Sequence, residues 1–271
     1  MKRSFFLIPG LLVVSALQAQ MKEGTVVYER KINMHRNITD EQMKAMIPEF
    51  RTSKHLLIFS DSTSLYKTLP EDEAPDPFAG SNGPRIIMRG SPADAGEVYK
   101  NFAQSKSVLS SELAGRNYLI VDTIKQQPWK LGNETKQVLG HLCHKATRSI
   151  TQAAGGIRMM TFNSGSTARR DSTQPQSKEV EVVAWYADDI ISPVGPDSYG
   201  QLPGLILAID VDNGATVFNA LEVKTAVDTR QLKEPKKGKI VTRAEYQKLM
   251  MDMMGTQMQG GGNGIVRFRT N

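Results

Sequence analysis

The chain has 271 residues and a formal net charge of +6, from 34 basic and 28 acidic residues. This length is sufficient to bury an ordinary hydrophobic core, and the single cysteine, Cys143, excludes an internal disulfide. The basic residues are not gathered into a run with interleaved aromatic residues, so the composition argues against nucleic-acid binding.

The first 20 residues have the composition of a cleavable secretory signal. Lys2 and Arg3 precede the apolar run 5–16, and small and polar residues follow it. This run is shorter than the roughly 20 residues that a membrane-spanning helix needs, so we expect residues 1–19 to be removed. No cysteine lies at the cleavage point to carry a lipid, and no later segment is long and apolar enough to span a bilayer. The sequence therefore predicts an exported protein of the periplasm or cell envelope, soluble or peripheral, without a transmembrane anchor.

Most periodic segments of the remaining chain alternate apolar and polar residues as β-strands do. The expected strands cover residues 24–32, 54–60, 64–69, 98–102, 107–113, 117–124, 143–151, 156–162, 179–186, 205–211 and 215–223. Asp212-Asn213-Gly214 separates the last two and is a strong hairpin signal. These strands, without the helical crossovers of a parallel sheet, predict a mainly β fold: a curled antiparallel sheet or an open half-barrel.

Two short helices complete the expected fold. A hydroxyl cap at Thr39 precedes the first, which ends before Pro48, and a capping box of Thr242 and Glu245 begins the second, which runs to about Met254. The chain is expected to divide into a β domain, 20–240, and a C-terminal helix with a flexible tail, 241–271. Stretches near 70–96 and 163–177 are rich in turn-forming and polar residues and are expected to be mobile insertions.

Residues 199–207 read Tyr-Gly-Gln-Leu-Pro-Gly-Leu-Ile-Leu, which resembles the signature of the GLPGLI family of envelope proteins, with Gln201 as a variation. Other landmarks of that family have counterparts in the same order: Trp129-Lys130-Leu131, Glu134-Thr135-Lys136, residues 140–146, Ala184-Trp185-Tyr186, Ile190 and Gly195-Pro196. The resemblance covers about 24–233 and implies an exported domain of envelope-bearing bacteria. It implies no catalytic residues, because the family is defined by its motif and not by an activity.

The signature segment has two interpretations. Pro203 fixes its own φ and Gly204 can adopt a positive φ, so the segment is typical of a turn that leads into a buried strand. Alternatively, this rigid corner forms the rim of an apolar ligand cleft or a partner surface with Trp185, Tyr186 and Tyr199. Residue spacing alone does not separate the two.

The metal-binding alternative concerns two groups of side chains, because thiolate, imidazole and thioether groups suit zinc or copper. His141 and Cys143 would share one face of a strand, and Met250, Met254 and Met258 recur at four-residue spacing on the second helix. Their structural interpretation is a small buried cysteine and a methionine packing face. An intermolecular disulfide through Cys143 is a third possibility.

No catalytic motif stands out: the sequence has no Gly-x-Ser-x-Gly elbow, no His-Glu-x-x-His and no phosphate-binding loop. We therefore expect no enzymatic activity and no cofactor. The leading hypothesis is a binding or accessory module for an apolar small molecule or an envelope protein, and the alternative is a periplasmic copper- or zinc-binding protein.

The export prediction is testable with a fusion of residues 1–20 to a reporter protein. The reporter should cross the inner membrane and be released without attached lipid, because the apolar run is too short to anchor it. N-terminal sequencing of the native protein checks the cleavage, and Met1 on the mature chain would contradict it.

Overall fold

The computed structural model describes residues 21–38, 41–70, 85–87, 96–153, 158–160 and 177–259. The expected signal peptide, the C-terminal tail and most of the two expected insertions lie outside these residues. No helix among the described residues has both the length and the hydropathy to cross a membrane.

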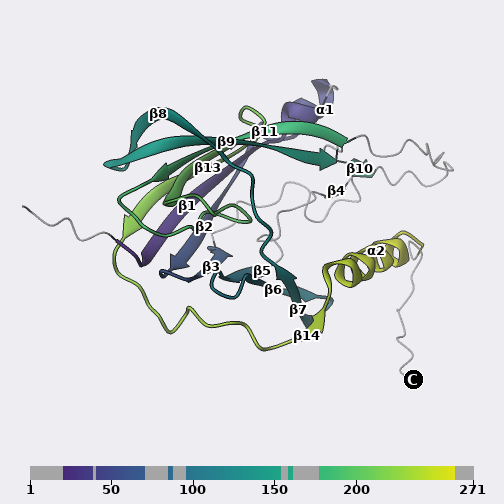
Figure 1. The fold of residues 1–271 in the computed structure, drawn as a ribbon. Helices are drawn as coiled ribbons and strands as arrows, with labels where there is room; N and C mark the ends of the chain where they lie inside the picture. Colours follow the sequence, from purple (N-terminus) through teal and green to yellow (C-terminus); the bar gives the residue numbers. More distant parts are fainter. Residues whose placement is uncertain are drawn as a thin grey trace, which may run out of the picture.

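One antiparallel sheet dominates the fold, and it curls from β8 through β1 and β2 to β7 and β14 (Figure 1). Its strands are β1 (Gly24–Asn33), β2 (Phe50–Phe59), β3 (Thr63–Thr68), β5 (Gly96–Asn101), β6 (Lys106–Leu113), β7 (Arg116–Thr123), β8 (Lys130–Val138), β9 (His141–Ala153), β11 (Ser177–Ala187), β12 (Leu205–Val211), β13 (Thr216–Lys224) and β14 (Lys239–Val241). Their order is β14-β7-β6-β5-β3-β2-β1-β13-β12-β11-β9-β8. Only the short β14–β7 pair is parallel. The predicted open, curled antiparallel sheet is confirmed.

Two helices and a small second sheet accompany the large sheet. The helices are α1 (Glu41–Met46) and α2 (Arg243–Gln259), with a 3-10 turn, η1 (His35–Asn37), before α1. The strands β4 (Arg85–Ile87) and β10 (Arg158–Met160) pair with each other.

The capping box of α2 forms as predicted: the Thr242 backbone N–H donates to Glu245 Oε2 at 2.7 Å, and the Glu245 N–H donates to Thr242 Oγ1 at 3.2 Å. The helix then runs past Met254 to Gln259, so it is longer than expected.

The curl brings distant strands of the sheet around one core. Ile120 on β7 and Cys143 on β9 lie near opposite edges in the strand order, yet both belong to the same cluster of packed apolar side chains. A second cluster gathers around β11 and β12 and includes Tyr199 and Phe218. Six of the seven residues of β12 are buried, which explains its continuous apolar sequence.

The edge strand β8 is not predicted by the sequence, because its residues are almost all exposed and have no apolar alternation. A bulge interrupts its pairing with β9: Leu131 pairs with Ala146 and Thr135 pairs with His144, so three residues face one. Bulges and charged side chains on an edge strand hinder further strand pairing. The edge at β8 is therefore a poor template for another chain.

Gly204 is required for a different reason from the one expected. Its φ is not among the positive values; Gln201, three residues earlier, has the left-handed φ of 64°. A Cβ atom on Gly204 would instead collide with the backbone carbonyl oxygen of Ala187. The glycine thus permits the start of β12 to pack directly against the end of β11.

This contact predicts the effect of Gly204→Ala on stability. The new methyl group must displace backbone atoms, so we expect the free energy of unfolding to fall by about 2 to 4 kcal/mol. Gly132→Ala is the matched control, because the nearest atom to its Cβ would lie 3.4 Å away. Chemical denaturation measures both changes. An equal, small loss for the two variants would contradict the close-approach explanation.

Candidate ligand pocket

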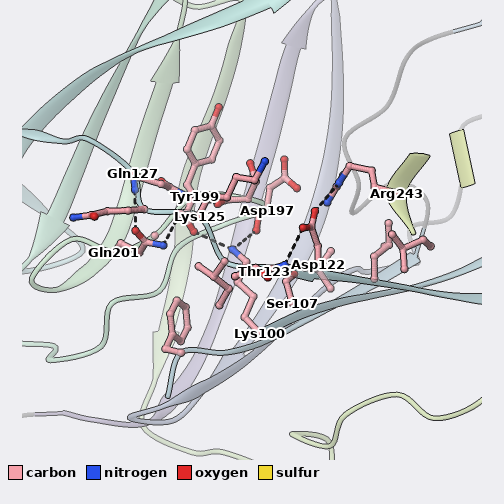
Figure 2. A pocket seen from close by; sticks show the side chains of 18 of the residues that line it. Lys100, Ser107, Asp122, Thr123, Lys125, Gln127, Asp197, Tyr199, Gln201 and Arg243 are labelled. Atoms are coloured by element: carbon pink, nitrogen blue, oxygen red, sulfur yellow. Dashed lines mark hydrogen bonds and ion pairs between the residues drawn. The ribbon is translucent and has the colours of Figure 1, made fainter. Parts of the chain in front are cut away.

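A pocket of about 470 Å³ lies inside the curl of the sheet. Residues two apart on a strand share a face, so β5, β6 and β7 each contribute alternate side chains to it. These are Val98 and Lys100, Ser107 and Leu109, and Ile120 and Asp122. The facing wall comes from residues 197–201, Arg148 of β9 and the segment 123–127 (Figure 2).

The segment 197–201 is tied to the segment that follows β7 by side-chain hydrogen bonds. Gln201 Oε1 accepts from the Gln127 backbone N–H at 2.9 Å, and Gln201 Nε2 donates to the Lys125 carbonyl at 2.9 Å. Gln127 Nε2 donates to the Ser198 carbonyl at 2.8 Å, and Trp129 Nε1 donates to the Gly200 carbonyl at 2.9 Å. These bonds hold one wall of the pocket in place.

Lys100 is fastened to the same segment from the opposite side. Its side chain is only 8% exposed, and Nζ donates to the backbone carbonyls of Asp197 at 2.7 Å and Tyr199 at 3.2 Å. Figure 2 shows this side chain reaching toward both residues. Burial lowers the pKa of Lys100 from its usual 10.5 to about 8, while the charge of Asp197 opposes this shift and that of Arg148 adds to it.

Arg148 places a second cation on the pocket. Its guanidinium carbon lies 4.8 Å from the ring centre of Trp129 and 5.3 Å from that of Tyr199. Two aromatic rings at these distances stabilise the positive charge of the guanidinium and restrict the motion of the side chain. Burial, with the charge of Asp197, raises the pKa of Tyr199 to about 12, so its hydroxyl is neutral at physiological pH.

Three buried polar atoms of the pocket residues have no hydrogen-bond partner in the part of the chain that the structure describes. They are Arg148 Nε, Asp197 Oδ1 and Gln127 Oε1. The Asp197 side chain is 7% exposed, and a carboxylate oxygen buried in this way costs free energy unless it finds a donor. One donor and two acceptors are therefore left for a group that enters the pocket.

The remaining charges of the pocket sit at its margin. Arg243 Nε pairs with Asp122 Oδ2 at 2.9 Å, and this hydrogen bond is the main cause that lowers the pKa of Asp122. Lys100, Lys125, Arg148 and Arg243 outnumber the acidic Asp122 and Asp197, so the pocket has a positive excess. This balance suits a small polar ligand that carries a negative charge.

The structure brings only one of the five predicted rim residues to this pocket. Tyr199 lines it. Trp185 is half-buried with Lys136 Nζ 4.4 Å from its ring centre, and Tyr186 is buried beside His144. Pro203 is exposed and Gly204 is packed against Ala187. An apolar cleft rimmed by all five remains a prediction.

Sequence reasoning missed Lys100, Arg148 and Asp197. Two of them carry a recognisable signal, because each lies on a predicted strand at a position that shares a face with apolar residues. Lys100 lies between Val98 and Phe102, and Arg148 follows Ala146 at the same spacing. A charged residue at such a position is either buried with partners or part of a site.

Among the described residues, no group of three or more His, Cys, Asp or Glu side chains is arranged to hold a metal ion. His141 Nδ1 lies 2.7 Å from Asp189 Oδ2, and His144 Nε2 lies 2.9 Å from Asp188 Oδ2. Cys143 is a buried, free thiol in the first core cluster.

The methionines of the alternative site are only partly described. Met250 packs against the first core cluster together with Leu249, as expected for a packing face. The side chains of Met254 and Met258 lie outside the described residues. A methionine site for copper therefore stays a prediction.

The environment of Cys143 predicts its reactivity. Burial raises the pKa of this thiol to about 11, so the nucleophilic thiolate is scarce in the folded protein. At pH near 8 we expect a thiol reagent to label the native protein at least about a hundredfold more slowly than the denatured protein. Fast native labelling, or bound zinc or copper that is lost in Cys143→Ser, would contradict the buried-thiol interpretation.

Comparison with known proteins gives a match of part of the chain to one family model and a similarity of fold. A family model described as "Protein of unknown function (Porph_ging)" matches residues 129–208. No curated protein matches the chain. Two solved structures of PNGF-II, in space groups P21 and C2, are similar to this chain with a TM-score of 0.50 and 16% sequence identity. Each match covers 85% of this chain and 33% of the PNGF-II chain, so this chain spans about a third of the length of that protein.

Proposed function

We propose that this protein is an exported, non-enzymatic binding module that holds a small, negatively charged polar molecule in the pocket inside its curled sheet. Export rests on the composition of residues 1–20. The observation that carries the binding proposal is the set of unsatisfied polar atoms: Arg148 Nε, Asp197 Oδ1 and Gln127 Oε1 are buried on one pocket without partners among the described residues.

Each part of the pocket has a role in such binding. Arg148, held beside Trp129 and Tyr199, has a free N–H donor for an anionic oxygen. Asp197 and Gln127 offer acceptors for hydroxyl or amine groups of the same molecule. A small ligand that satisfies these atoms replaces a desolvation cost with hydrogen bonds, which favours its binding.

The pocket chemistry changes the expected ligand class. The sequence favours an apolar ligand or a protein partner, whereas charged and polar side chains make up much of this lining. An apolar molecule would leave Arg148, Asp197 and Gln127 unsatisfied and would therefore bind with a penalty. A polar anion is the better proposal for this pocket.

The substitution Arg148→Met tests the proposal, because it keeps the length of the side chain and removes its charge and donors. Isothermal calorimetry with lactate, succinate and inorganic phosphate should detect binding of at least one anion to the wild-type protein. We expect Arg148→Met to weaken that binding about tenfold or more, since a hydrogen bond to a charged group contributes about 1.5 to 3 kcal/mol.

Arg230→Met is the matched control, because Arg230 is exposed, pairs with Asp228 and does not line the pocket. It should bind the same anion with unchanged affinity. The binding proposal fails if none of the three anions binds the wild-type protein, or if Arg148→Met and Arg230→Met bind equally well.

A further inference from the structure

The amine of Lys100 has an environment unlike that of the other described lysines. Among these residues it is the only buried lysine, and it lines the pocket. Its position on β5 is fixed by pairing of that strand with β3 and β6, so the side chain is presented from a rigid element. The two carbonyls that accept its hydrogen bonds belong to a segment that is itself held by Gln201 and Trp129.

These two hydrogen bonds determine what the amine can offer to a ligand. A neutral amine has two N–H bonds and one lone pair. The carbonyls of Asp197 and Tyr199 accept from Nζ, so they can occupy both N–H groups. In that state only the lone pair of Nζ is left without an interaction. Because Lys100 lines the pocket, this lone pair is available to a ligand there.

Burial favours the neutral form of Lys100, and the surrounding charges act in both directions. The hydrogen-bond partners of Nζ are two backbone carbonyls, which carry no net charge. Burial lowers the pKa of Lys100 to about 8, Asp197 opposes the shift and Arg148 adds to it. The other charged groups on this pocket are Asp122, Lys125 and Arg243. A desolvated amine beside another cation is the environment of a nucleophilic lysine.

We propose that the ligand of this pocket is a small 2-oxo acid, which Lys100 captures reversibly as an imine. The inference rests on the proposed binding function and specifies its ligand. Arg148 holds the carboxylate, and the adjacent aldehyde or ketone carbon lies within the pocket that Lys100 lines. Arg148 would bind the carboxylate of any small acid, whereas the buried amine of Lys100 can react only with an acid that also has a ketone or aldehyde group.

The capture step requires no oxidant, reductant or cofactor. The lone pair of Nζ forms a bond to the carbonyl carbon, the carbonyl oxygen gains a proton, and the nitrogen loses one, which gives a carbinolamine. The carbon–oxygen bond then breaks, water leaves with the former carbonyl oxygen, and an imine remains. A water molecule in the pocket can carry the proton from nitrogen to the unpartnered carboxylate oxygen of Asp197, which lies on the same pocket, and return it to the departing hydroxyl.

Reductive trapping tests this step on the full chain. The protein is incubated with pyruvate and sodium cyanoborohydride, and intact mass spectrometry followed by peptide mapping locates the carboxyethyl group that forms. We expect one adduct, on Lys100, whose rate of formation rises with pH up to about 8 as the amine loses its proton. Lactate has a hydroxyl group in place of the ketone of pyruvate, so it should form no adduct and should slow trapping by pyruvate.

Two variants serve as controls for the trapping. Lys100→Arg should form no adduct at this position, and Lys224→Arg, which changes an exposed lysine of β13, should be trapped at Lys100 as in the wild-type protein. Competition by lactate in the wild-type chain keeps the test independent of whether Lys100→Arg folds.

The outcomes separate this inference from the proposed function. If lactate binds but pyruvate is not trapped at Lys100, or modifies exposed lysines equally fast, imine capture is wrong and the binding function stands. If no adduct forms and none of pyruvate, lactate, succinate and phosphate binds, both the binding function and the inference are wrong. A single adduct on Lys100 that lactate suppresses supports both.

Discussion

The close approach of Gly204 to Ala187 is the constraint on which the pocket depends. Because no side chain separates these residues, β12 begins directly beside the end of β11, and this contact fixes the end of the turn that precedes β12. That turn carries Asp197, Tyr199 and Gln201. Lys100, bonded to its carbonyls from β5, then links the turn to the other half of the curl. The same contacts that close the fold therefore shape the pocket.

The buried charges that line the pocket oppose the stability of the fold. In the unfolded chain Lys100 has its usual pKa of 10.5, whereas in the folded protein it is about 8, so the native state binds fewer protons between these values. The free energy of unfolding therefore rises with pH across that window, and the full cost is present below pH of about 8. A protein under selection for stability alone would place an apolar residue on this face of β5. The cost is consistent with a role in binding.

The sequence predicts much of the fold because its strands are long and alternate clearly. β1 is an example, with Gly24, Val26, Tyr28 and Arg30 buried and the residues between them more exposed. The sequence does not predict β8, because an edge strand without a buried face has no alternation of apolar and polar residues. The sequence indicates a glycine-dependent turn at Gly204 but not the physical reason for it, since a close approach between backbones depends on the pairing of β11 with β12 and leaves no local pattern.

The pocket was harder to predict than the fold because its residues are distant in the sequence. The spacing of Lys100 and Arg148 on their strands is visible, but only the curl of the sheet places β5 opposite β9. Tertiary packing determines the register of the strands and the curvature of the sheet, and the apolar–polar alternation of the sequence predicts neither of them. The aromatic residues Trp185 and Tyr186 were the more conspicuous candidates, yet both lie outside the lining of the pocket.

The two proposed ligand-binding residues also differ in whether the family model covers them. Arg148, Trp129, Asp197 and Tyr199 all lie within residues 129–208, which the family model matches, whereas Lys100 lies before this region. The proposed anion-binding cation and the proposed amine thus come from separate parts of the chain that meet only in the folded protein. In the proposals, Arg148 binds the carboxylate of the acid, and capture of its carbonyl group also requires Lys100 of β5. In the two proposals, Arg148 within the matched region provides affinity for anions, and Lys100 on β5, which precedes that region, determines the choice among acids.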